Sequence, residues 1–319
     1  MDPRIVADPH WYWYIVFYFF IGGIAAGIAF TGALAALAGS ERMRPVVRLS
    51  QLLPLPLVLI CTVILIVDLS RPERFFHMII QRATWLPMFK YWSPMSYGSW
   101  ILTVFGALTT INFFAALWED RRGPMVRVSR AIGPRLTGLL DRVPGMLTGG
   151  LVGTLFQVLM LVFSYGLASY TGALLNATNQ LFWSDSPLIG ALFFVSAVGT
   201  GISAMLLILL RRRRAVDHEV IEGLETADNW AMLLELLLIV AFFVSLGPLA
   251  GPLLLSRYGL AIVAGTAVFG LLYPMILHRF PRMLGPSSPI IAAVLALAGG
   301  FVLRWAVIWA AQGVLVAGR

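Results

Sequence analysis

The chain has 319 residues, of which 59% are hydrophobic and only 12% are charged, and its formal net charge is +8. A soluble domain carries roughly 25% charged residues, so this composition excludes an ordinary soluble protein. The basic excess does not indicate nucleic-acid binding, because the arginines cluster between long apolar segments, as membrane topology requires. The sequence therefore predicts an all-α integral membrane protein that forms a single polytopic transmembrane domain over residues 1–319.

Eight apolar segments are long enough to cross the membrane. A helix needs about 20 apolar residues to span roughly 30 Å of hydrocarbon, and backbone groups in lipid must be paired within the segment. The first segment contains Gly23 and Gly27, a spacing that lets two helices approach closely. We expect spans at residues 13–38, 50–69, 95–118, 149–170, 187–210, 229–247, 258–277 and 288–311.

Arginines mark the loops that follow alternate spans. The positive-inside rule places such loops in the cytoplasm, so we expect both termini on the outer side. The basic residues are Arg42, Arg44 and Arg48 after the first span, Arg121, Arg122, Arg127, Arg130, Arg135 and Arg142 after the third, Arg211 to Arg214 after the fifth, and Arg279 and Arg282 after the seventh.

The second loop contradicts this pattern. It runs from Asp68 to Tyr97 and must face outward, yet it carries four basic residues: Arg71, Arg74, Arg82 and Lys90. One interpretation is that these residues dock an extramembrane partner or hold an anionic group. The other is that the more strongly basic loops after the third and fifth spans set the topology, so the second loop faces outward in spite of its charge. The sequence leaves both interpretations open.

Polar side chains lie near the expected outer ends of several spans. Asp68 ends the second span, Tyr170 ends the fourth, and Arg304 lies within the eighth. An arginine inside an apolar helix needs a partner or water, so Arg304 is a functional candidate with Asp68 as its partner, unless it snorkels to the interface. We predict that these three residues converge on one outer pocket, with four others near its rim: Tyr14, Tyr18, His77 and Tyr97.

A polar mouth on an apolar bundle suits a ligand with a polar head and an apolar tail. A quinone is such a ligand, because its carbonyl groups need hydrogen-bond donors and its redox chemistry needs proton carriers. A lipid headgroup would suit the same residues. On this interpretation Tyr170 is the donor, and Asp68 or His77 carries protons.

A second cluster lies at the cytoplasmic start of the sixth span. Asp228 and Glu235 are seven residues apart, which places them on one helix face about two turns from each other. Carboxyl groups at this depth could carry protons, or they could form structural hydrogen bonds between helices. The histidines supply no buried ligand pair for a haem, since all lie at span ends or in loops: His10, His77, His218 and His278.

Several segments resemble the NrfD/polysulfide reductase membrane-subunit family. The matching segments follow the family's order along the sequence, and Glu235 follows the last of them. They are IGGIAAG at residues 21–27, DLSRPERF at 68–75, SPMSYGSW at 93–100, YTGALL at 170–175 and DNW at 228–230.

This resemblance implies a quinone-binding anchor of a respiratory oxidoreductase in the bacterial cytoplasmic membrane. Family members are haem-free, bind menaquinone or ubiquinone, and arrange eight helices as two four-helix bundles. They dock a ferredoxin-like subunit with four iron–sulfur clusters, which connects them to a molybdopterin catalytic subunit on the outer face. Iron–sulfur clusters and molybdopterin therefore belong to partner subunits. Tyr170 matches the tyrosine that contacts the quinone head, whereas Ile15 and Tyr18 replace the asparagine and histidine of some members.

Two other functions remain open from the sequence. A secondary transporter or proton channel would use the same polar residues, Asp228, Glu235, Asp68 and Arg304. Transporters often contain a pair of interrupted helices near the middle of the membrane, and we find no such pair in this sequence. A purely structural membrane anchor without a quinone site is the third possibility.

Overall fold

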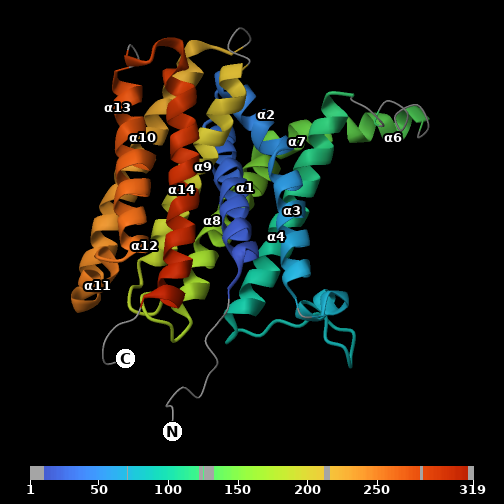
Figure 1. Cartoon of the computed structure of the whole chain (residues 1–319). Coiled ribbons are helices and arrows are strands. Elements are labelled where there is room, and N and C mark those ends of the chain that lie inside the picture. Colours follow the sequence, from blue (N-terminus) through green and yellow to red (C-terminus); the bar gives the residue numbers. More distant parts are fainter. Residues whose placement is uncertain are drawn as a thin grey trace.

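Helices account for nearly all of the protein that the computed structural model describes, which is residues 11–69, 71–121, 125, 133–211, 216–280 and 283–314 (Figure 1). Within these ranges eight helices are long and apolar enough to cross a membrane, which confirms the expected all-α membrane fold. The spans are Trp13–Leu37, Glu41–Asp68, Pro94–Glu119, Gly150–Asn176, Ile189–Arg211, His218–Ser245, Arg257–Arg279 and Ser288–Gly313.

The first four spans contain α1 (Trp13–Leu37), α2 (Arg44–Leu52) with α3 (Pro54–Asp68), α4 (Pro94–Glu119) and α8 (Gly150–Asn176). A break separates α2 from α3 at Pro54, because proline donates no backbone hydrogen bond and its ring crowds the preceding turn. At the start of α4, Ser93 caps the helix by accepting a hydrogen bond from the Ser96 backbone, and Pro94 occupies the first turn.

The last four spans contain α9 (Ile189–Arg211), α10 (His218–Ser245), the composite seventh span and α14 (Ser288–Gly313). The seventh span begins as α12 (Arg257–Leu260), continues as a π-helical segment, η5 (Ala261–Leu272), and ends as α13 (Tyr273–Arg279). Short helices η4 (Gly247–Leu249) and α11 (Ala250–Leu254) connect α10 to α12.

The spans form two groups of four, and α1 and α9 join the groups. Helix α1 packs on α3 and α8 in its own group, while α9 packs on α10 and α14. Glycines bring α1 and α9 into direct backbone contact, since a Cβ atom on Gly27 would fall 1.9 Å from the carbonyl oxygen of Ala197. This contact matches the helix-packing role that the glycine spacing predicted.

The first and last described helices meet at one end of the molecule. The backbone amide of Trp11 donates a hydrogen bond to Oε1 of Gln312 over 3.0 Å. Asp68 and the 3₁₀ helix η2 (Pro72–Met78) lie at this same end, because Trp11, Asp68 and Phe75 line one cavity. The termini themselves, residues 1–10 and 315–319, lie outside the described residues.

The opposite end carries the first and third loops. It contains η1 (Glu41–Met43), α2, α6 (Gly133–Leu140) and α7 (Val143–Thr148) (Figure 1). Arg42, Arg44, Arg48, Arg121 and Arg142 belong to it, as the loop pattern predicted. Other arginines of the predicted cytoplasmic loops lie outside the described residues: Arg122, Arg127, Arg130, Arg212 to Arg214 and Arg282.

Candidate functional site

A cavity of about 470 Å³ lies between α1, α3, α4 and α8, at the end of the bundle where α1 begins, and we call it the outer cavity after the side that the loop charges predict for this end. Its walls are mostly aliphatic and aromatic, and η2 contributes Phe75 and Met78. Its polar side chains are few: Tyr18, Thr62, Asp68, Ser99, Thr103, Thr110 and Tyr170. Apolar walls with a small number of placed polar groups are the usual form of a small-molecule site.

The cavity follows one face of α4 into the membrane. Gly98, Leu102, Gly106 and Thr110 recur every fourth residue along this wall, so they lie above one another on the helix. Twelve residues separate Gly98 from Thr110, which corresponds to a depth of about 18 Å at 1.5 Å per residue. The space therefore has a polar end near Asp68 and Tyr170 and a long apolar extension.

Tyr170 reaches the cavity from α8 across the bare backbone of Gly98. A Cβ atom on Gly98 would fall 2.0 Å from Cζ of Tyr170 and 2.2 Å from its hydroxyl oxygen. No side chain other than hydrogen fits there while the ring keeps this position. Tyr18, on α1, is buried with 3% exposure and lines the same cavity.

Asp68 is the last residue of α3 and combines solvent exposure with a place in the cavity wall. In the described part of the protein we find no ion pair between Asp68 and any basic residue. The carboxyl group therefore connects the polar end of the cavity with the surface. The structure thus brings three of the seven candidate residues together, namely Asp68, Tyr170 and Tyr18.

Four candidates lie outside the walls of this cavity. Tyr14 is half exposed on α1. Tyr97 faces a separate cavity beside Phe89 and Trp100. His77 packs its ring on Phe76, with 4.2 Å between ring centroids, although its neighbours on η2 line the outer cavity. The fourth is Arg304.

Arg304 is the main correction to the predicted pocket. It is 1% exposed, so it does not snorkel to the interface, and its partners are not Asp68 but groups on α1, α9 and α14. Its Nε donates to the Phe19 carbonyl over 3.1 Å, and its Nη1 donates to Ser196 Oγ over 3.0 Å and to the Gly300 carbonyl over 2.8 Å. Hydropathy indicated how deep Arg304 lies in the membrane, but it did not indicate which neighbouring helices its side chain faces.

Asp228 and Glu235 are both buried and lie on one face of α10, as their spacing predicted, and this face points toward α9. A Cβ atom on Gly199 of α9 would lie 3.8 Å from Asp228 Oδ1 and 3.9 Å from Glu235 Oε2. Ser203 donates its hydroxyl to Asp228 over 3.0 Å.

Polar contacts extend from this pair to Arg304. Ser196 hydrogen-bonds to Glu235 and accepts from Arg304, so its hydroxyl joins the two charged side chains. Arg304 in turn holds the Phe19 carbonyl, and Phe19 lines the outer cavity. Polar contacts therefore link Glu235 to the wall of that cavity, and Asp228 lies two turns from Glu235 on the same face of α10.

The second loop keeps its basic residues accessible. Arg71, Arg74, Arg82 and Lys90 are all exposed, and Arg74 is 3.8 Å from its neighbour Glu73. Large aromatic side chains of the same loop are exposed beside them: Phe75, Trp85, Phe89, Tyr91 and Trp92. This surface lies at the same end of the molecule as the outer cavity.

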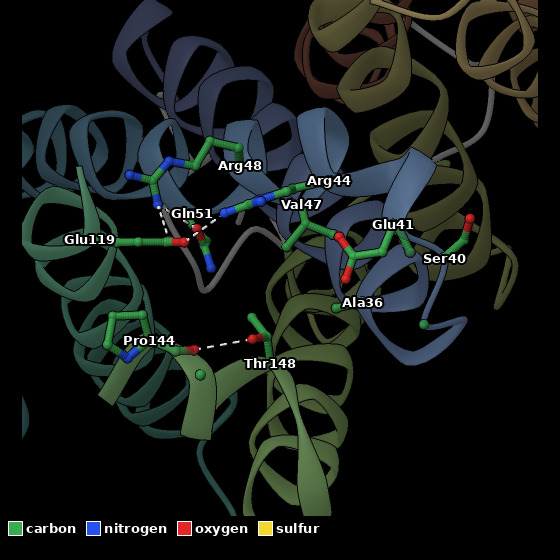
Figure 2. A pocket seen from close by; sticks show the side chains of 13 residues that line it. Ala36, Ser40, Glu41, Arg44, Val47, Arg48, Gln51, Glu119, Pro144 and Thr148 are labelled. Atoms are coloured by element: carbon green, nitrogen blue, oxygen red, sulfur yellow. Dashed lines mark hydrogen bonds and ion pairs between the residues drawn. The ribbon is translucent and has the colours of Figure 1, made fainter. Parts of the chain in front are cut away.

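A second cavity, of about 320 Å³, lies at the opposite end between α1, α2, α4 and α7 (Figure 2). Charged residues line it, including Glu41, Arg44, Arg48 and Glu119. The sequence indicates only a topological role for the arginines among them. The roles of Gly98, which lies in the SPMSYGSW segment, and of Ser196 were not predicted, because each is simply a small residue near or within an apolar span.

Comparisons with known proteins cover almost the whole sequence. The family model described as "Polysulphide reductase, NrfD" matches residues 4–317. The protein is 26% identical over 322 residues to "Protein NrfD" of Escherichia coli (strain K12), a match that covers 95% of both sequences. It is 24% identical over 323 residues to the C subunit of polysulfide reductase from Wolinella succinogenes, covering 95% of this sequence and 94% of the relative. A "Protein NrfD homolog" of Haemophilus influenzae is 25% identical over 331 residues, with coverage of 95% and 94%.

Proposed function

The chain belongs to the NrfD polysulphide reductase family, and from this premise we propose that it binds quinone or quinol as the membrane subunit of a respiratory oxidoreductase. It is a multi-pass protein of the bacterial cytoplasmic membrane. In the proposed function it passes electrons between menaquinone or ubiquinone and an iron–sulfur partner subunit, and it holds no haem of its own.

The observation that carries this proposal is the outer cavity with Tyr170 and Asp68 at its polar end. Its apolar length of about 18 Å suits an isoprenoid tail, and its polar end suits a ring with two carbonyl groups. A quinone supplies reversible chemistry of two electrons and two protons. The residues present therefore fit the ligand that the family membership implies.

The side chains of the cavity take distinct roles in this proposal. The Tyr170 hydroxyl donates a hydrogen bond to a carbonyl group of the ligand, and the Gly98 backbone holds the ring in position. Asp68 exchanges protons with the outer aqueous phase, because its carboxyl group is both exposed and part of the cavity wall. Buried Tyr18 closes the cavity toward α1 and excludes water there.

Electron transfer needs a partner on the outer face. We propose that the exposed Arg71, Arg74, Arg82 and Lys90 dock a ferredoxin-like subunit with four iron–sulfur clusters. That subunit would connect to a molybdopterin catalytic subunit. The position of the basic loop beside the outer cavity supports this arrangement, because electron transfer favours a short path between a cluster and the quinone.

Proton movement across the membrane is a further part of the proposal. The series Asp228, Glu235, Ser196 and Arg304 provides buried polar groups between the opposite end of the bundle and the cavity wall. The same series supports the second candidate function, a proton channel or secondary transporter that works without quinone. Turnover with quinone distinguishes the two functions.

The test uses the assembled complex with two variants, Tyr170→Phe and Asp68→Asn. Tyr170→Phe removes one hydrogen bond to the ligand, so we expect quinone-dependent turnover to fall about tenfold. Electron transfer from substrate to an artificial acceptor on the soluble subunits should persist. Tyr165→Phe is the matched control, because Tyr165 lies on the same helix, is 53% exposed and does not line the cavity.

Unchanged quinone turnover in both variants would contradict the proposed site. If the complex also assembles normally, the protein is then a structural anchor. If proton flux in vesicles persists without quinone, the channel function replaces the proposal.

A further inference from the structure

The cavity at the end opposite Asp68 is built from several separate elements. Ala35 and Ala36 come from the last turn of α1, Glu41 from η1, and Gln51 from α2. The remaining walls are the end of α4, at Glu119, and α7, which contributes Pro144, Gly145 and Thr148 (Figure 2). By the positive-inside rule this end faces the cytoplasm, so the cavity lies at the level of the inner leaflet's headgroups.

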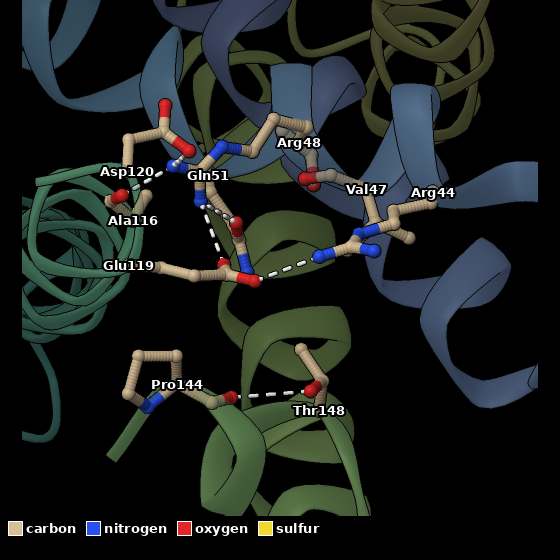
Figure 3. Close-up of polar contacts among 10 residues, drawn as sticks. Arg44, Val47, Arg48, Gln51, Ala116, Glu119, Asp120, Pro144 and Thr148 are labelled. Carbon is tan, nitrogen blue, oxygen red and sulfur yellow. Dashed lines mark hydrogen bonds and ion pairs between the residues drawn. The ribbon is translucent and has the colours of Figure 1, made fainter. Parts of the chain in front are cut away.

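Most charges around this cavity are already paired. Arg48 Nη1 contacts Glu119 Oε2 over 3.1 Å, Arg48 Nη2 contacts Asp120 Oδ1 over 2.5 Å, and Arg44 Nη2 contacts Glu119 Oε1 over 2.9 Å (Figure 3). Both oxygens of Glu119 are therefore engaged. The cluster holds α2 against the end of α4. It leaves donor groups of Gln51 and Arg44 available to a ligand.

Gln51 is the first free donor. Its side chain is 5% exposed, and its Oε1 accepts a hydrogen bond from Arg48 Nη1 over 3.0 Å. The other end of the amide, Nε2, therefore points away from Arg48 and into the cavity, between Glu119 and Thr148 (Figure 3). Among the hydrogen bonds of the described residues we find none donated by Nε2, so this N–H group is available to a ligand in the cavity.

Arg44 and Glu41 supply opposite charges at the same cavity. Arg44 uses only Nη2 for Glu119, and its side chain is 72% exposed, so the remaining edge of its guanidinium is available. Glu41 is exposed, and in the described part of the protein it forms no ion pair. Arg44 and Gln51 together suit a phosphate, and Glu41 suits a cation bound close to that phosphate.

Apolar side chains flank the cavity on the outside of the bundle. Leu34 and Leu37 are exposed on the same turn of α1 that lines it, and Met146 is 51% exposed on α7. Such side chains are suited to acyl chains, whereas a purely aqueous site would be flanked by polar residues.

We propose that this cavity binds the headgroup of a zwitterionic phospholipid from the cytoplasmic leaflet. The phosphodiester receives hydrogen bonds from Arg44 and the Gln51 amide, and a primary ammonium donates to the Glu41 carboxylate. Phosphatidylethanolamine has this chemistry. A bound headgroup would join α2, α4 and α7 at one point and stabilise the cytoplasmic end of the first four spans.

The test is native mass spectrometry of the delipidated, full-length protein in detergent, with three lipids of identical acyl chains. We expect phosphatidylethanolamine to be retained about tenfold better than phosphatidylglycerol or phosphatidylcholine, because neither has a primary ammonium group. Arg44→Gln should reduce retention of phosphatidylethanolamine about tenfold, since it removes a charge-assisted contact to the phosphate. Glu41→Gln should abolish the preference for phosphatidylethanolamine over phosphatidylglycerol, because the ammonium group loses its carboxylate partner.

The matched control is Arg42→Gln, which removes an arginine two residues away that pairs with exposed Glu219 and does not line the cavity. Its lipid retention should equal that of the wild type. A thermal unfolding midpoint without lipid checks that each variant is folded, and Glu41→Gln is expected to match the wild type there.

Three results would overturn the proposal. Equal retention of the three lipids would show that Glu41 makes no contact with an ammonium group. Unchanged retention in Arg44→Gln and Glu41→Gln would place bound lipid elsewhere. Protection against heat by inorganic phosphate alone, equal to that by phosphatidylethanolamine, would identify a soluble phosphate ligand in place of a lipid.

Discussion

The phenol ring of Tyr170 lies against the backbone of Gly98, where a Cβ atom would come within 2.0 Å of the ring's Cζ. This contact brings α8 and α4 together at the polar end of the outer cavity and fixes where the Tyr170 hydroxyl lies. Ser93 and Pro94 set the start of α4, and Gly98 lies about one turn further along the helix.

The first prediction is that Gly98→Ala lowers quinone-dependent turnover by at least about tenfold, because a misplacement of about 1 Å in a reacting site can cost on the order of 100-fold. The added methyl group must displace the Tyr170 ring. In the Tyr170→Leu background the same substitution should have little further effect, since the ring that it displaces is absent. The measurement is quinone turnover of the four proteins in a double-mutant cycle.

Gly106→Ala is the control for this prediction. Gly106 lines the same cavity two turns along α4, but its nearest neighbour to a new Cβ atom is Val58 Cγ1 at 3.8 Å, an ordinary contact. It should keep wild-type turnover. Additive losses in Gly98→Ala and Tyr170→Leu would show that Gly98 acts on helix packing and not through the ring.

The sequence predicted the fold of this protein more completely than its site. Hydropathy and arginine clusters depend on composition, so they located all eight spans and the loops between them. Residue spacing placed Asp228 and Glu235 on one helix face. The partners of Arg304 could not be predicted, because depth along a helix does not determine which neighbour its side chain faces.

Gly98 shows a different reason for a missed residue. Its contribution is the absence of a side chain, and only the packing of α8 against α4 makes that absence matter. Gln51 was missed because its availability depends on a contact: Arg48 donates to its Oε1, which leaves its Nε2 facing the cavity. Both residues depend on contacts that sequence position alone does not specify.

The second prediction concerns Arg48, which donates to Glu119, Gln51 and the carbonyl of Ala116 and pairs with Asp120. Arg48→Ala removes the one donor that these groups share, although Glu119 keeps Arg44 and the Ala116 carbonyl keeps the Asp120 amide, so we expect a loss of about 1–3 kcal/mol in stability. Thermal unfolding in detergent measures the change. Arg48→Lys should recover only part of it, because an ammonium group cannot contact several acceptors as the guanidinium fork does.

Arg42→Ala provides the comparison for Arg48. Arg42 pairs with Glu219, and both side chains are about two-thirds exposed, at 67% and 69%. An exposed pair contributes roughly 0–1 kcal/mol, so this variant should unfold near the wild-type temperature. Equal effects of the two substitutions would mean that the cluster around Arg48 does not stabilise the helix ends.

The third prediction concerns assembly. Reversing the charge of Arg74 and Arg82 to glutamate should weaken retention of the iron–sulfur subunit about tenfold at low salt, because exposed charges steer association. The wild-type complex should itself dissociate more readily as salt rises. The measurement is co-purification across a salt series. The same reversal at Arg42 and Arg142, at the opposite end of the molecule, should have no effect, and full assembly after reversal of the whole second loop would place docking elsewhere.

The fourth prediction is that Glu235→Gln slows proton movement during quinone turnover by on the order of 100-fold, the effect expected when a positioned side chain that transfers protons is lost. Glutamine keeps the shape of the side chain and can still accept from Ser196, so the contact between Ser196 and Arg304 should survive and the protein should fold. Proton uptake and release by vesicles, measured together with turnover, tests this expectation.

The control for Glu235 is Glu222→Gln on the same helix. Glu222 is 64% exposed and pairs with His218 one turn away, outside the buried series, so its replacement should leave both rates unchanged. If Glu235→Gln also leaves turnover and proton stoichiometry unchanged, the buried carboxyl groups only join α10 to α9. If it stops proton movement while quinone turnover continues, the two processes are separable. Asp228→Asn should then give the same result, since both carboxyl groups face Gly199 on α9.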